Sequence, residues 1–165
     1  MAGMEKRLDR IGLCLACGVS IHKTPLNKDH YFPQAMLTFP QSIDREEHPF
    51  RRLILDKANI FRLCIPDHIE IDRKKMEAYG GPNVVDIDPV ALVHFLSSYP
   101  VTNNPRYRTV QILNMIESHS RFISSVGKLN GEFPKSLANR YKEAAGASKT
   151  LIVEQLVSVL HKMSV

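Results

Sequence analysis

The chain has 165 residues, of which 44% are hydrophobic and 24% are charged; this composition excludes widespread disorder and allows a packed core. The formal net charge of +5 favours a polyanionic partner. No apolar stretch approaches the roughly 18 residues of a membrane span, and the N-terminal segment lacks the apolar centre of a signal peptide. We therefore expect a cytoplasmic protein without membrane association, with one domain or a compact domain plus an extension.

The N-terminal part of the chain predicts short elements. Residues 3–13 fit a short helix or turn, and residues 28–33 (KDHYFP) fit a strand that ends at Pro33. Residues 35–50 have a mixed pattern with a polar loop, and residues 51–57 fit either a helix or a strand. No element is predicted between 58 and 65.

The C-terminal part of the chain is predicted to be helical. A helix over about 66–79 ends at the Gly80-Gly81 pair, and residues 81–88 have the composition of a linker. Three further helical segments, separated by loops rich in Pro, Gly and Asn, cover about 88–98, 105–127 and 134–163.

The three cysteines form a pattern typical of a metal site. Cys14 and Cys17 make a C-x2-C knuckle followed by Gly18, which permits a tight turn, and Cys64 lies far downstream. An odd number of cysteines argues against a closed disulfide framework. A reduced C-x2-C is usually a redox pair or half of a zinc site, and no βαβ pattern surrounds Cys14, so zinc is the better interpretation.

A structural zinc ion needs a fourth ligand. Asp67 stands where a second cysteine would complete a C-x2-C pair with Cys64. Its carboxylate is a harder ligand than thiolate, so such a site should hold zinc less tightly. His22 and His68 are the competing candidates.

Three motifs follow one another in the chain: the knuckle Cys14-x2-Cys17, the run Asp29-His30-x2-Pro33, and the segment from Asn59 to His68 that contains Cys64-x2-Asp67. Together they resemble the HNH endonucleases, the ββα-metal family. The resemblance covers residues 14 to about 75. It implies an α+β fold in which residues 1–80 form a zinc-supported ββα-metal unit, followed after the linker by a helical region over 89–165.

The resemblance also implies a metal-dependent endonuclease that hydrolyses phosphodiester bonds of DNA. His30 would be the general base, and Asp29 with His68 would hold a catalytic Mg²⁺ or Mn²⁺ ion. Asn59 would either bind that metal or fix the loop that orients His30. The structural zinc would be held by Cys14, Cys17, Cys64 and Asp67.

The aspartate in the second pair departs from the family pattern. If Asp67 does not bind zinc, His68 is drawn into the structural site and the catalytic metal loses a ligand. The alternative function is therefore a catalytically inactive HNH-like zinc scaffold that binds nucleic acid or protein.

Basic residues outnumber acidic ones, eight to three, between positions 103 and 149. Such side chains give sequence-independent contacts to phosphates, although a solvated helix face would have the same composition. The predicted nucleic-acid contacts are Arg106, Arg108, Lys135, Arg140 and Lys142.

The last predicted helix carries an apolar stripe at helical spacing, which should be buried. We expect it to pack on the 105–127 helix or, alternatively, to form a homodimer interface. The stripe comprises Ile152, Val153, Leu156, Val157, Leu160 and Met163, and the matching residues of the other helix are Val110, Leu113, Ile116 and Ile123.

Overall fold

The computed structural model describes residues 12–80 and 87–163, and their fold is mixed α+β with one two-stranded sheet and mostly helices. Most of the helix or turn expected over 3–13 and most of the linker expected over 81–88 lie outside the described residues. None of the helices in the described ranges is long and apolar enough to cross a bilayer.

The sheet pairs two segments that are far apart in the sequence. Strand β1 (Leu26–His30) runs antiparallel to β2 (Ile60–Cys64), with Leu26 opposite Cys64 and His30 opposite Ile60. Helix α2 (Ile65–Ala78) follows β2 directly and packs on both strands. A long segment with short helices separates the two strands in the chain, and the second strand was not predicted from the pattern.

β1 ends three residues before the expected Pro33. After His30, the backbone N–H of Phe32 donates to the side-chain Oδ1 of Asn59 at 2.7 Å, and its carbonyl accepts from Asn59 Nδ2 at 3.0 Å. The backbone of Phe32 is therefore satisfied by a side chain and not by a neighbouring strand, which ends the ladder.

Short helical turns connect the two strands. The segment expected as helix or strand over 51–57 forms helix α1 (Arg51–Leu55), and the 3-10 turn η4 (Lys57–Asn59) leads into β2. The mixed region before it contains two further 3-10 turns, η2 (Gln34–Leu37) and η3 (Arg45–Glu47).

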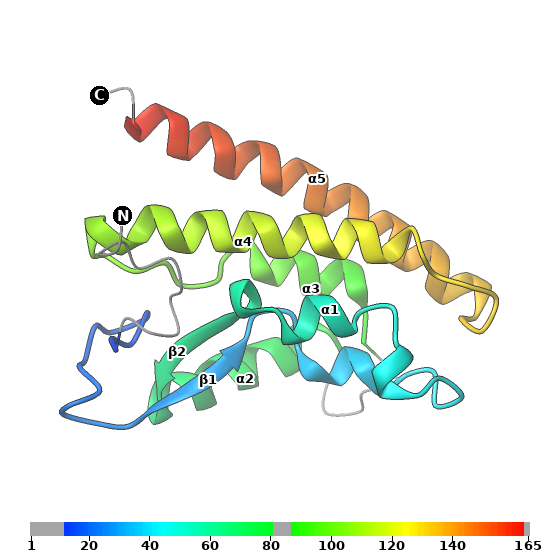
Figure 1. Cartoon of the computed structure of the whole chain (residues 1–165), viewed down its shortest axis with the longest axis horizontal. Helices are drawn as coiled ribbons and strands as arrows, with labels where there is room; N and C mark the ends of the chain where they lie inside the picture. The colour runs from blue at the N-terminus through cyan, green and yellow to red at the C-terminus, as the bar shows by residue number, and fades with distance from the viewer. Residues whose placement is uncertain (1–11, 81–86, 164–165) are drawn as a thin grey trace.

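The three C-terminal helices lie close to their predicted ranges: α3 (Pro89–Leu96), α4 (Pro105–Val126) and α5 (Lys135–Met163). The side chains of Asp88 and Asn104 accept backbone N–H groups at the first turns of α3 and α4, and each is followed by a proline suited to that position. α4 and α5 run in opposite directions on one side of the molecule, and the sheet and α2 lie on the other (Figure 1).

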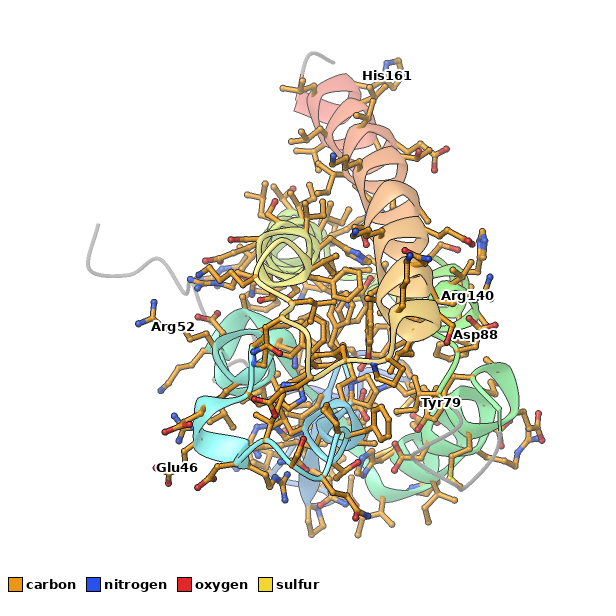
Figure 2. All side chains as sticks on the ribbon, turned by 90° about the vertical axis from the view of Figure 1, so that its right-hand side faces the viewer. Glu46, Arg52, Tyr79, Asp88, Arg140 and His161 are labelled. Carbon is orange, nitrogen blue, oxygen red and sulfur yellow. The ribbon has the colours of Figure 1, made fainter. Side chains whose placement is uncertain are left out.

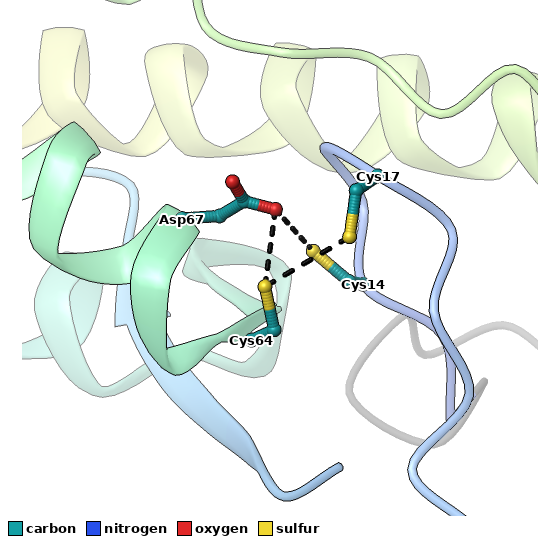
Figure 3. Close-up of side chains that lie close together, drawn as sticks. All are labelled: Cys14, Cys17, Cys64 and Asp67. Atoms are coloured by element: carbon teal, nitrogen blue, oxygen red, sulfur yellow. Dashed lines mark hydrogen bonds between the residues drawn. The ribbon is translucent and has the colours of Figure 1, made fainter. Parts of the chain in front are cut away.

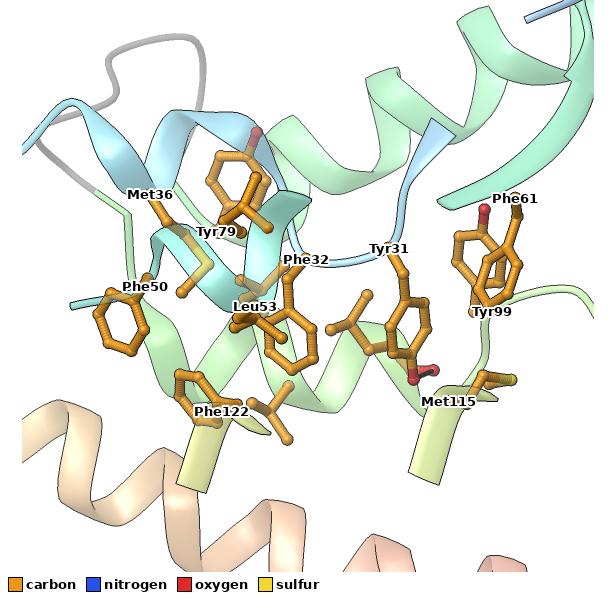
Figure 4. Packing of buried hydrophobic residues seen from close by; sticks show 14 of the residues in the cluster. Tyr31, Phe32, Met36, Phe50, Leu53, Phe61, Tyr79, Tyr99, Met115 and Phe122 are labelled. Carbon is orange, nitrogen blue, oxygen red and sulfur yellow. Dashed lines mark hydrogen bonds between the residues drawn. The ribbon is translucent and has the colours of Figure 1, made fainter. Parts of the chain in front are cut away.

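One hydrophobic core includes residues from both predicted units. Phe32, just after β1, stacks on Phe122 of α4 with ring centroids 5.0 Å apart. Tyr31 packs edge-on against Tyr99 (Figure 4). The Tyr31 hydroxyl donates to the backbone carbonyl of Leu96 at 3.1 Å. The helical region therefore packs directly against the segment that carries the Asp29-His30 motif.

The prediction of which face of α5 packs on α4 is wrong. Val153, Val157 and Leu160 are about three-fifths exposed, and Leu113 of α4 is 46% exposed. The buried face of α5 instead contains small side chains near its middle, and Ser148 Oγ lies 2.8 Å from His119 Nδ1 of α4. Small side chains let this face approach α4. The end of α5 near His161 projects from the body (Figure 2), and Val153, Leu156, Val157 and Leu160 of the predicted stripe stay accessible.

Candidate metal centres

The first candidate centre lies where the N-terminal knuckle meets the start of α2 (Figure 3). The knuckle is closed by two backbone bonds, from Cys14 N–H to Val19 carbonyl at 2.9 Å and from Gly18 N–H to Cys14 carbonyl at 2.8 Å. Gly18 has φ 79°, a conformation that favours glycine. Cys64 is the last residue of β2 and directly precedes α2, and this position lies beside the knuckle.

The ligand atoms of Cys14, Cys17, Cys64 and Asp67 all lie within 4.8 Å of one another. Asp67 Oδ2 is 3.2 Å from Cys14 Sγ and 3.1 Å from Cys64 Sγ, and the Sγ atoms of Cys17 and Cys64 are 3.8 Å apart. With Zn–S bonds of about 2.3 Å, two sulfurs of a tetrahedral site lie about 3.8 Å apart. The cluster therefore has the donor set and the size of a structural zinc site.

Two groups of this cluster, the Cys64 thiol and the Asp67 carboxyl, have shifted pKa values. Burial, with a further contribution from the Asp67 carboxylate, raises the pKa of Cys64 to about 12. Hydrogen bonds from Cys64 and the other two thiols lower the pKa of Asp67. Because zinc binds thiolates, loading would release protons. Of the three candidates for the fourth ligand, Asp67 lies in the cluster, whereas His22 is exposed outside it and His68 faces a second cluster.

The second candidate centre joins β1 and α2. His68 Nε2 lies 3.3 Å from Asp29 Oδ1 and 3.3 Å from Asp72 Oδ2. These spacings suit adjacent ligands of an octahedral divalent ion, which lie about 3.0 Å apart when the bonds are near 2.1 Å. Asp29 and His68 are brought together as expected, and Asp72 was missed. The four-residue step from His68 to Asp72, which places both on one helix face, is the signal that would have found it.

Asp29 and His30 are adjacent at the end of β1, and they differ in burial. Asp29 is 1% exposed, whereas His30 is half-buried. Burial lowers the pKa of His30, Asp29 opposes the shift, and Lys75 adds to it. Among the described residues the His30 ring makes no hydrogen bond.

Both residues line a cavity of about 230 Å³ between β1, η2 and α2. The cavity therefore places His30, the expected base, beside the candidate metal ligands Asp29 and His68. Its other lining residues are Lys28, Pro33, Gln34, His68, Asp72, Lys75 and Tyr79.

Two further residues contact the Oδ2 atom of Asp29, and neither was predicted. Lys75 Nζ lies 3.0 Å from Asp29 Oδ2 and 2.6 Å from the carbonyl oxygen of His30. The hydroxyl of Tyr99 donates to the same Oδ2 at 2.5 Å. Lys75 lies one turn beyond Asp72 on α2, but Tyr99 lies between α3 and α4, 70 residues from Asp29, so no local pattern could reveal it.

Asn59 was expected either to bind metal or to fix the loop after His30, and its contacts are those of the second role. Its side chain is fully buried, and Nδ2 donates to the carbonyl of Ile54 at 3.1 Å in addition to the two bonds with Phe32. These three bonds tie the loop after His30 to the end of α1.

The five predicted nucleic-acid contacts do not form one patch. Arg106 and Arg108 begin α4, whereas the other three begin α5, and the antiparallel helices place these starts at opposite ends (Figure 1). Arg140 is also engaged by Asp88, whose two carboxylate oxygens each lie 2.7 Å from Nη2 (Figure 2). Arg140 therefore helps to join α5 to the start of α3.

No protein family, curated protein or solved structure matched this chain when it was compared with them. The two candidate metal centres and the cavity between β1 and α2 therefore carry the functional assignment.

Proposed function

We propose that the protein is a metal-dependent endonuclease of the HNH type that hydrolyses phosphodiester bonds of DNA. The observation that carries the proposal is the cavity between β1 and α2. It unites a half-buried histidine, His30, with the divalent-ion ligand set Asp29, His68 and Asp72. The antiparallel strand pair with α2 packed on it, and the four-ligand zinc-like cluster at the start of α2, support the same family.

Each residue then has a distinct role. A divalent ion bound by Asp29, His68 and Asp72 would offset negative charge on the phosphate and the leaving oxygen. His30, with an imidazole that is neutral near pH 7, takes the proton of the attacking water. Asn59 keeps the loop after His30 in place through its three buried hydrogen bonds.

Contacts to the DNA backbone would begin at the cavity itself. Lys28 lines the cavity, is exposed, and lies opposite Arg62 across the two strands. The exposed ammonium of Lys28 is therefore available to an oxygen of the DNA backbone. Arg106, Arg108, Lys135 and Lys142 are more distant candidates at the ends of α4 and α5.

The alternative is an HNH-like scaffold without catalysis that binds nucleic acid or protein. Two observations favour it: an aspartate replaces a zinc-binding cysteine, and the ammonium of Lys75 already places a positive charge 3.0 Å from Asp29. The intact set of Asp29, His30 and His68 favours the nuclease, because a binding module has no need of a base beside a divalent site.

The two functions are separated by incubating supercoiled plasmid with the protein in Mg²⁺, in Mn²⁺ and in chelator. We expect nicking with either ion and none with chelator. His30→Ala should abolish nicking while the protein still folds. His94→Ala, which removes an exposed histidine on α3, should cut like the wild type. Cutting without metal, or full activity of His30→Ala, would refute the nuclease.

A further inference from the structure

The most unusual buried charge in the described part of the chain is Lys75, which is 2% exposed. Its ammonium is shared between Asp29 Oδ2, the carbonyl oxygen of His30 and the face of the Tyr99 ring, whose centroid is 5.6 Å away. A buried lysine needs such partners because the charged form is costly to desolvate. These partners are a proposed metal ligand and the backbone of the proposed base.

The two oxygens of Asp29 have different surroundings. Oδ2 accepts from Lys75 and from the hydroxyl of Tyr99 at 3.0 and 2.5 Å, whereas Oδ1 faces His68 Nε2 at 3.3 Å. The carboxylate is therefore held on one side and presents one oxygen to the candidate metal position. Rotation of the carboxylate would break both bonds to Oδ2.

We propose that Lys75 and Tyr99 are positioning residues of the divalent-metal site. They fix Asp29 so that Oδ1 faces the ion, and Lys75 ties the backbone of His30 to the same carboxylate. This inference rests on the proposed nuclease function. Because Tyr99 belongs to the helical region, the site is complete only when that region is packed against the segment with the Asp29-His30 motif.

A buried ion pair by itself is weak evidence for a role, since its desolvation can exceed its attraction. The Asp29–Lys75 pair differs from such a pair because Asp29 is also a proposed metal ligand. Hydrogen-bond partners of metal ligands set ligand orientation, and removing them typically weakens metal binding or activity by about 10- to 100-fold.

The test compares two variants that each remove one buried tyrosine hydroxyl. Tyr99→Phe removes the bond to Asp29, whereas Tyr31→Phe, the matched control, removes bonds to Leu96 and His119 in the same core. Binding of Mn²⁺ to the full-length protein is measured by the loss of the free-ion electron paramagnetic resonance signal, and folding by circular dichroism. Plasmid nicking at saturating Mn²⁺ is measured in parallel.

We expect Tyr99→Phe to bind Mn²⁺ at least about tenfold more weakly and Tyr31→Phe to bind it like the wild type, although both lose some thermal stability. Equal affinities in all three proteins would overturn the positioning role, as would a wild type that binds no Mn²⁺. A wild type that binds Mn²⁺ but never nicks DNA would refute the nuclease, while a weaker affinity in Tyr99→Phe alone would still establish the positioning role.

Discussion

Lys75→Met should be among the most destabilising substitutions in the protein. Asp29 and Lys75 are both almost fully buried and 3.0 Å apart, so the variant leaves a carboxylate in the interior without its countercharge. Removing one partner of such a pair costs about 3–5 kcal/mol. Tyr99 still donates to Oδ2, which favours the lower end, about 3 kcal/mol. For a chain of this length that loss lowers the melting temperature by about 6–12 °C.

The free energy of unfolding is measured by urea titration at pH 7 in buffer without added divalent ions. The exposed neighbour provides the matched control: Lys74→Met, which removes only a 3.9 Å surface pair with Glu70, should change stability by less than about 0.5 kcal/mol. The double variant Asp29→Asn/Lys75→Met removes both charges and should recover most of the loss, a coupling that a double-mutant cycle isolates. A loss below about 1 kcal/mol in Lys75→Met would refute the reasoning.

Three further predictions concern the zinc cluster, a buried histidine and the exposed face of α5. Asp67→Cys should bind zinc more tightly, because thiolate is the softer ligand, and competition with a chromogenic chelator measures this; unchanged affinity would exclude Asp67 from the site. Burial lowers the pKa of His119 from 6.5 to about 3. Between these values the unfolded chain binds more protons than the folded one, so stability falls as the pH falls through this window. Between pH 7 and pH 5 this histidine should lower the free energy of unfolding of the wild type by about 2 kcal/mol. In urea unfolding, His119→Gln should therefore lose about 2 kcal/mol less than the wild type over the same pH change. Equal losses in the two proteins would contradict the assignment. Finally, we propose that the exposed apolar residues of α5 form a homodimer interface, so light scattering should give a dimer for the wild type and a monomer for Leu160→Asp; a wild type that stays monomeric at high concentration would exclude it.

Local chemistry made much of the secondary structure predictable. α3 and α4 begin where Asp88 and Asn104 cap them and a proline follows, and these signals act within a few residues. The knuckle was predictable for the same reason, because two cysteines and Gly18 form one turn. Cys64 and Asp67 were assigned to the same site because their spacing matches a second C-x2-C pair, and the structure places both beside the knuckle.

Only the tertiary structure decided which residues surround the candidate divalent site and which face of α5 is buried. Tyr99 reaches Asp29 across 70 residues of chain, and that contact depends on how the helical region packs on the sheet. The face of α5 was set by competition between two apolar stripes: the one with small side chains around Ser148 packs on α4, and the bulkier one around Val157 stays exposed. A sequence pattern shows that a face is apolar, but the choice between two such faces depends on the shape of the surface that receives the helix.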